Sequence, residues 1–308
     1  MLRTFFVRLS ENPSLRNFAE RSSLGRRVSG RFVAGTEIAD AVRATQAINQ
    51  AGMSVSIDNL GENVTNPDEA RHSAQLYHQI LEAIAANHLN ANISLKLTHM
   101  GLDVDEGLAR DIVSGLVAEA AAMNPPGFVR VDMEGSPYTQ RTLDFVHELH
   151  RMPGNGNSVG TVIQAYLRRS ESDIEKLLAE GIRIRLCKGA YKESADIAFA
   201  AKSEVDANYV KLMKILMKSG IYHGLATHDE SIVQQAEAFA KAENLARDSF
   251  EFQMLYGIRR DLQQRLVREG WRVRVYIPFG TEWYPYFMRR LGERPANVLF
   301  IVRNLLRA

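Results

Sequence analysis

The sequence predicts an α/β protein, a (βα)8 barrel of the TIM type with extra N-terminal helices and a final helix over the barrel mouth. Eight short runs of β-branched and apolar residues recur along the chain, and helical patterns lie between them. Such alternation is typical of βαβ units and a parallel sheet. The length of 308 residues suits one barrel of about 250 residues with additions.

The expected strands are short segments bounded by turn-forming residues. They cover residues 54–58, 92–96, 128–132, 159–164, 182–186, 222–227, 250–253 and 272–276. Helices are expected between them, for example over residues 68–87, 106–123, 138–151, 171–180 and 231–243. Asn66-Pro67 and Ser136-Pro137 are helix start signals, and Gly181 and Gly270 are stop signals before strands five and eight.

No linker divides the chain, so residues 51–308 are expected to form one barrel domain after an N-terminal helical arm, residues 1–50. Residues 1–31 contain seven arginines against two acids, a net charge of +5. Such a segment can be a targeting peptide or an arm that binds a membrane surface. The alternative, which we favour, is a pair of short cationic helices that pack beside the domain through residues such as Leu15 and Phe18.

The composition and the motifs argue against several classes of protein. A formal net charge of +2 gives no argument for a nucleic-acid partner, and no apolar run reaches the roughly 18–20 residues that span a bilayer. With Cys187 as its single cysteine the chain has no disulfide framework, which favours a reducing compartment such as the cytoplasm. Metal-binding and dinucleotide-binding motifs are absent, and Cys187 is expected to be a small apolar residue inside the barrel.

Every expected strand ends in a hydrogen-bonding or ionisable residue. In a barrel, the carboxyl ends of the strands surround the active site. Three of these residues, Lys96, Arg185 and Lys188, are cations that suit a carboxylate or phosphate ligand. The sequence therefore predicts a polar site at the barrel mouth. Its residues are Asp58, Asn59, Lys96, Asp132, Glu134, Gln164, Arg185, Lys188, Thr227, His228, Gln253 and Tyr276.

A second charged group follows the last strand. On a helix, Tyr286, Arg289, Arg290 and Glu293 share one face. This pattern also fits a solvated surface helix with an Arg–Glu pair. The neighbouring Trp283, Tyr284 and Phe287 make the helix rich in aromatic surface, which favours packing against the barrel.

These motifs resemble the proline dehydrogenase family, in particular its short bacterial monofunctional members. The matching stretches run in the family's order over about residues 53–300 and include Ser94-Leu-Lys-Leu97, Val131-Asp-Met-Glu134, Arg185-Leu-Cys-Lys-Gly-Ala-Tyr191, Ala226-Thr-His-Asp229 and Tyr286 through Asn297. The resemblance implies FAD-dependent oxidation of L-proline to Δ1-pyrroline-5-carboxylate by hydride transfer to flavin N5. Electrons would then pass to a membrane quinone, in the first step of proline catabolism.

The resemblance also implies roles for individual residues on the substrate side. Lys96, Arg289 and Arg290 would hold the substrate carboxylate, Glu62 would pair with Arg289, and Glu293 would brace the arginines. Asp132 would orient Lys96 and Tyr276. The residues packed against the substrate ring would be Leu255, Tyr276 and Tyr286.

On the cofactor side, the resemblance places Arg185 near flavin N5, Gln164 at the ring edge and Tyr191 near the isoalloxazine. The remaining cofactor-binding residues implied are Asp132, Lys188, Gly189, Ala190, Thr227, His228 and Gln253. Peripheral association with the inner face of a membrane would bring the enzyme to its quinone.

Two other classes fit the residues. Lys96 or Lys188 at a strand end could form a Schiff base in an aldolase-like lyase. The barrel could also bind an amino acid without catalysis.

Overall fold

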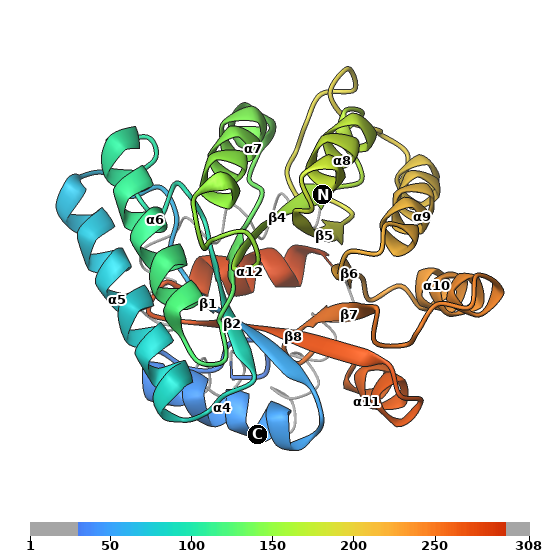
Figure 1. Cartoon of the computed structure of the whole chain (residues 1–308), viewed down its shortest axis with the longest axis horizontal. Coiled ribbons are helices and arrows are strands. Elements are labelled where there is room, and N and C mark those ends of the chain that lie inside the picture. Colours follow the sequence, from blue (N-terminus) through green and yellow to red (C-terminus); the bar gives the residue numbers. More distant parts are fainter. Residues whose placement is uncertain (1–29, 294–308) are drawn as a thin grey trace.

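A closed barrel of parallel strands is the frame of the molecule (Figure 1). The computed structural model describes residues 30–293. The eight strands pair with their neighbours in chain order, and β8 closes on β1. They are β1 (Ser54–Asn59), β2 (Ala91–Leu95), β3 (Val129–Val131), β4 (Val159–Gln164), β5 (Arg183–Cys187), β6 (His223–Ala226), β7 (Phe250–Leu255) and β8 (Arg272–Phe279).

Helices surround the barrel, as the sequence predicts (Figure 1). They are α4 (Ile38–Gln50), α5 (Pro67–Ala86), α6 (Glu106–Ala122), α7 (Ser136–Arg151), α8 (Ser170–Ala179), α9 (Lys202–Lys218), α10 (Glu230–Ala242), α11 (Arg260–Arg268) and α12 (Trp283–Glu293). The side chain of Asn66 caps α5, accepting a hydrogen bond from the Glu69 N–H at 3.0 Å. The expected start signal therefore works as predicted.

The strands agree with their predicted bounds to within a few residues, and β8 differs most. β8 continues three residues beyond the predicted end at Tyr276, because its register with β1 extends to Asn59 and Phe279. β3 keeps only three residues of the expected five. β4 has the predicted bounds.

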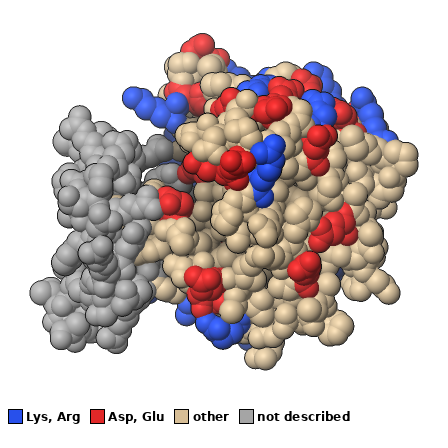
Figure 2. Space-filling model, turned by 90° about the vertical axis from the view of Figure 1, so that its left-hand side faces the viewer, with Lys and Arg blue, Asp and Glu red and all other residues tan. Residues whose placement is uncertain are grey.

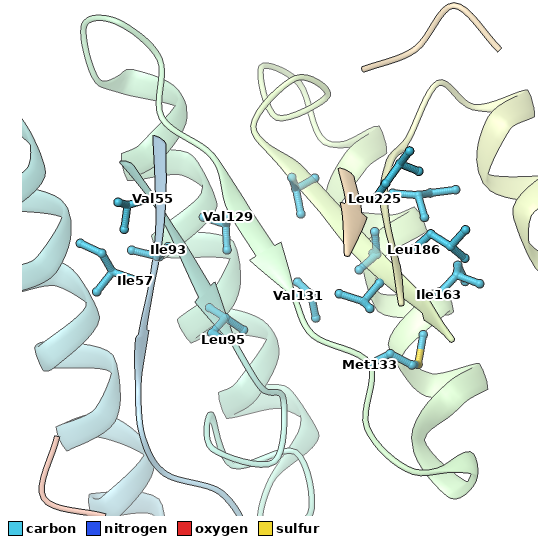
Figure 3. Packing of buried hydrophobic residues seen from close by; sticks show 14 of the residues in the cluster. Val55, Ile57, Ile93, Leu95, Val129, Val131, Met133, Ile163, Leu186 and Leu225 are labelled. Carbon is cyan, nitrogen blue, oxygen red and sulfur yellow. The ribbon is translucent and has the colours of Figure 1, made fainter. Parts of the chain in front are cut away.

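The strands alternate between two environments. Most of their apolar residues point outward and form one core with the helices; Figure 3 shows Val55 and Ile57 extending from β1 toward a flanking helix. The intervening residues face the barrel interior, where most TIM barrels place branched apolar side chains. Here many of them are polar, and these are Ser56, Asp58, Asn92, Ser94, Arg130, Asp132, Gln164, Arg185, Glu251, Gln253 and Arg274.

Helix α4 covers the outside of the barrel where β8 meets β1. It packs there through Ala41 and, partly buried, Ile38, Val42 and Ile48. α4 therefore occupies the outer face of β8, where the helix that follows this strand would otherwise pack, and α12 lies across the barrel instead (Figure 1). α4 falls within the predicted arm, residues 1–50, whose boundary stays a prediction because residues 1–29 lie outside the described residues.

Helix α12 packs on the mouth of the barrel. Trp283, Tyr286, Phe287 and Met288 form an apolar cluster with residues at the strand ends and before α4, namely Phe32, Val33, Leu60, Leu255 and Ile258. The Phe32 and Phe287 ring centroids are 6.1 Å apart. The predicted helix over the mouth is confirmed, and its aromatic residues are the reason that it stays there.

The surface in Figure 2 carries acidic and basic side chains side by side, with uncharged residues between them. That face has no single-sign field of the kind that attracts nucleic acid. Among residues 30–293, no helix is both long and apolar enough to cross a bilayer.

Glycine 160 makes room for the polar interior. A Cβ there would lie 2.3 Å from the Arg183 carbonyl oxygen and 2.9 Å from Arg130 Nη1. We therefore expect Gly160→Ala to lower the free energy of unfolding by about 1–3 kcal/mol in urea titrations. Gly115→Ala is the control, because Gly115 lies on the exposed side of α6 and nothing lies within 4 Å of a Cβ placed there. This substitution should raise the free energy of unfolding by about 0.5–1 kcal/mol. Equal effects of the two substitutions would contradict the close packing at Gly160.

Candidate active site

A carboxylate–guanidinium pair lies at the centre of the barrel. Asp132 follows β3, and its Oδ1 accepts hydrogen bonds from Arg185 Nη1 and Ser94 Oγ, both at 2.8 Å. Its Oδ2 accepts one from the Tyr276 hydroxyl at 3.1 Å. Four strands or strand ends thus converge on one carboxylate. Sequence reasoning predicted the contact with Tyr276 but not the pair with Arg185.

Arg185 is held on all sides. Its Nε donates to Gln253 Oε1 at 2.5 Å, and its two Nη atoms donate to Ser56 and Ser94 hydroxyls at 3.1 Å. The guanidinium also lies 5.2 Å from the centre of the Tyr276 ring. With the side chain only 7% exposed, these contacts fix the guanidinium at one place below the mouth.

Lys96 pairs with a different carboxylate from the one expected. Its Nζ lies 3.6 Å from Asp58 Oδ1, whereas Asp132 acts on it only through its longer-range charge. Burial raises the pKa of Asp58 to about 6, with Lys96 opposing the shift and Asp132 adding to it. Burial alone would lower the pKa of Lys96, but Asp58, Asp132 and Glu62 together raise it. Lys96 therefore stays a cation.

A protonated lysine is a poor nucleophile, so this geometry argues against Lys96 as a Schiff-base residue. Cys187 is equally inert, because burial raises its pKa to about 12. It lies half-buried on the inward side of β5, which agrees with its expected place in the barrel. Within the described chain, no three His, Cys, Asp or Glu side chains gather where they could hold a metal.

The rim beside Lys96 is acidic and aromatic. Glu62 is half-buried, and its charge lies close enough to Lys96 to help raise the pKa of that lysine. Glu134 accepts hydrogen bonds from the Thr98 N–H at 3.1 Å and hydroxyl at 2.7 Å. Gln164 donates to the Glu134 carbonyl oxygen at 2.9 Å. Tyr191 is 37% exposed, unusual for an aromatic ring in this structure.

A second polar group lies at the ends of β5 and β6. Lys188 Nζ is 2.5 Å from Asp206 Oδ1 and 2.9 Å from Asp229 Oδ2. Thr227 Oγ1 accepts from the Asp229 N–H, and His228 Nε2 accepts from the Leu255 N–H at 2.9 Å. Lys188, Thr227 and His228 are thus brought together as predicted, while Gln253 is drawn into the barrel interior beside Arg185.

Gly189 adopts a conformation that only glycine tolerates easily. Its φ is +111°, and a Cβ would lie 2.2 Å from the Tyr166 ring. The loop after β5 therefore passes close to the end of β4. Ala190 follows it in an exposed position.

The substrate-side residues of α12 are only partly described. Tyr286 is 7% exposed and clusters with Leu255 at the mouth, as predicted. Arg289, Arg290 and Glu293 belong to α12, but their side chains lie outside the described residues.

Sequence reasoning missed the polar residues of the barrel interior below the strand ends, among them Ser56, Ser94, Glu251 and Arg274. Ser56 and Ser94 bind Arg185 and Asp132, and Glu251 and Arg274 form an ion pair with a 2.6 Å contact below them. The signal was present as strict alternation, for example in Arg272-Val-Arg-Val-Tyr276. Residues two or four positions before an inward-facing strand end also face inward, because side chains alternate along a strand.

Comparisons with known proteins decide the family. The model of the family "Proline dehydrogenase" matches residues 41–303. Proline dehydrogenase 1 of Bacillus subtilis (strain 168) is 40% identical over 308 residues, all of this chain and all of that protein. The chain belongs to the proline dehydrogenase family. It is an oxidoreductase of this family, which oxidises proline in proline catabolism and is flavin-dependent.

Other proline dehydrogenases agree with this assignment. That of Deinococcus radiodurans is 38% identical and covers 100% of this chain and 98% of that one. The proline utilization A (PutA) of Bdellovibrio bacteriovorus, solved after inactivation by N-propargylglycine, superposes with a TM-score of 0.81 at 25% identity. The match covers 87% of this chain and 32% of that longer one. The barrel architecture is thus shared with the larger protein.

The Asp58 pKa predicts a pH-dependent stability. Because its value of about 6 exceeds the ordinary 3.8, the folded chain binds more protons than the unfolded one between these values. The contribution of Asp58 to stability therefore falls as pH rises from about 4 to 6, by on the order of 3 kcal/mol. Urea unfolding across this range should show that Asp58→Asn removes this decline. Parallel pH profiles for the two proteins would contradict the assignment.

Proposed function

We propose that this proline dehydrogenase binds FAD at the mouth of its barrel and oxidises L-proline to Δ1-pyrroline-5-carboxylate by hydride transfer to flavin N5. The observation that carries the proposal is the set of fixed donors at the strand ends, led by Arg185. Family membership supports the reaction, and the donors gathered at the strand ends support the proposed positions of the bound groups.

The residues present fit a flavin. The donor set around the ends of β4, β5 and β6 contains the amide of Gln164, the cations Arg185 and Lys188, and the side chains of Thr227 and His228. Gly189 lets the backbone take a tight turn between them. When bound, the flavin accepts the hydride. Arg185 would donate a hydrogen bond near N5, and a fixed cation there stabilises the negative charge that reduction brings.

The proposed substrate half lies on the opposite side of the mouth. Lys96 stays charged, because Asp58 and Asp132 outweigh its burial, and it would bind the proline carboxylate. Arg289 and Arg290 would complete this clamp from α12, with Glu62 paired to Arg289 and Glu293 bracing both. Leu255, Tyr276 and Tyr286 would pack against the ring. These roles rest on the family resemblance and on the position of α12 over the mouth.

Positioning is the main contribution that the chain would make to the rate. Asp132 holds Tyr276 by a 3.1 Å hydrogen bond and Arg185 by a 2.8 Å ion pair, so one carboxylate orients groups of both halves. Such fixed geometry lowers the entropic cost of bringing donor and acceptor atoms together. The proline amine would release its proton to solvent, which agrees with the lack of an activated histidine or cysteine among the described groups around Arg185 and Asp132, where burial keeps Cys187 protonated.

We further propose a quinone as electron acceptor and a cytoplasmic protein that associates peripherally with the inner face of a membrane. The quinone rests on the family resemblance. The membrane association rests on the charge of residues 1–31, seven arginines against two acids, which the favoured packing beside the domain would not remove. Co-sedimentation with anionic vesicles, reversed by salt, is the expected result. Unchanged binding after replacement of these arginines by glutamine would contradict the role of the segment.

Anaerobic addition of L-proline to the purified protein tests the reaction. We expect the flavin absorbance bands to bleach, and air or a quinone analogue to restore them. A colourless protein, or one whose bands do not respond to proline, would overturn the proposal.

Lys96→Met tests the carboxylate clamp. A lost charge-assisted contact of about 1.5–3 kcal/mol predicts a rise in KM for proline of about 10- to 100-fold, with flavin content retained. The control is Lys211→Met, because Lys211 is 57% exposed on α9 and pairs with Glu171, and neither residue belongs to the candidate site. Steady-state dye reduction measures both. An unchanged KM for Lys96→Met would remove Lys96 from the site.

A further inference from the structure

The base of the barrel, opposite the candidate active site, contains a small polar cavity. Its volume is about 20 Å³, and its lining includes Asn92, Arg130, Arg183, Glu251 and Arg274. These residues lie in the amino-terminal halves of β2, β3, β5, β7 and β8. Since one water-sized species needs roughly 10–15 Å³, the cavity has room for one or two.

The lining carries more positive than negative charge. Three guanidinium groups face one carboxylate, and that carboxylate is fully engaged. Glu251 Oε1 accepts from Arg274 Nε and Gln253 Nε2, both at 2.6 Å, and Oε2 accepts from the Tyr222 hydroxyl at 2.9 Å. The negative charge of Glu251 therefore offsets the positive charge of its partner Arg274, and the positive charges of Arg130 and Arg183 are left without a paired carboxylate among the described residues.

No other described carboxylate compensates these two arginines. Neither of them forms an ion pair within residues 30–293, and Asp132, the next acid above them, is paired with Arg185. Neighbouring His223 adds no further positive charge, since burial and the two arginines lower its pKa to about 3 and keep it neutral. The excess of two positive charges is therefore local to the cavity.

Arg130 is the more strongly buried of the pair, at 4% exposure. Its Nη1 donates to the carbonyl oxygens of Thr161 at 2.8 Å and Arg183 at 2.7 Å, but its buried Nε has no partner. Both guanidinium groups stack on Phe128, with Cζ 4.6 Å and 4.3 Å from the ring centre. One ring therefore contacts two like charges, and the burial of these charges is costly without an anion.

We propose that this cavity binds one small monovalent inorganic anion of the size of chloride, held by Arg130 and Arg183. A water molecule could accept the free N–H but would leave both charges uncompensated in a medium of low dielectric constant. A tetrahedral oxyanion is too large for the volume. The site stabilises the barrel base, and the chain of hydrogen bonds from Arg274 through Glu251 and Gln253 connects it to Arg185.

Two measurements on the full-length chain test the proposal. At constant ionic strength, exchange of gluconate for chloride or bromide should raise Tm, with the effect saturating at or below about 0.15 M, the physiological ionic strength. Crystals grown in bromide should show an anomalous peak between Arg130 and Arg183. Equal Tm values in the two salts together with no peak would overturn the site, as water would then fill it. A peak without stabilisation would mean an adventitious ion only.

Arg183→Gln should weaken the chloride effect at least tenfold, as expected for loss of a charge-assisted contact. Arg272→Gln is the matched control: Arg272 starts β8, is 55% exposed and pairs with Asp248 outside the cavity. An unchanged chloride effect in Arg183→Gln would also overturn the proposal. If that variant does not fold, the bromide crystals of the unsubstituted chain decide. None of these readouts needs flavin or proline, so their failure is distinct from failure of the proposed function.

Discussion

The barrel interior depends on the burial of one guanidinium group. Arg185 reaches into the centre of the sheet, and Asp132, Gln253, Ser56 and Ser94 bind it from four other strands or strand ends. A buried cation is tolerated only when its charge and its N–H groups are satisfied. The polar residues of β1, β2 and β7 and at the end of β3 therefore depend on one another, because the loss of any of them leaves part of the Arg185 guanidinium unpaired.

The same network joins the two halves that we propose for the mouth. Asp132 is shared by Arg185, on the side proposed for the cofactor, and by Tyr276, on the side proposed for the substrate. Lys96 pairs instead with Asp58, a buried carboxyl group whose pKa is raised to about 6 by its burial. The carboxylates thus hold the cations of the proposed site at fixed positions, so their charge is oriented toward a ligand before it binds.

The position of α12 follows from a different constraint, the covering of the outer wall. Because α4 shields β8 and β1, the last helix is free to cross the mouth, where aromatic residues anchor it on Leu60 and Leu255. Below the strand ends, the same inward alternation that builds the site continues into a cationic base. The candidate site and the base of the barrel are therefore built from inward-facing residues of the same strands.

The sequence by itself determined the strand and helix order, the polar strand ends and the family, because alternation, helix caps and specific motifs are local signals. It did not determine which polar residues pair. The Arg185–Asp132 contact joins positions 53 residues apart, Lys96 takes Asp58 instead of Asp132, and Gln253 turns inward. Only closure of the barrel decided these pairs, since register and strand tilt set which inward side chains meet at the same height.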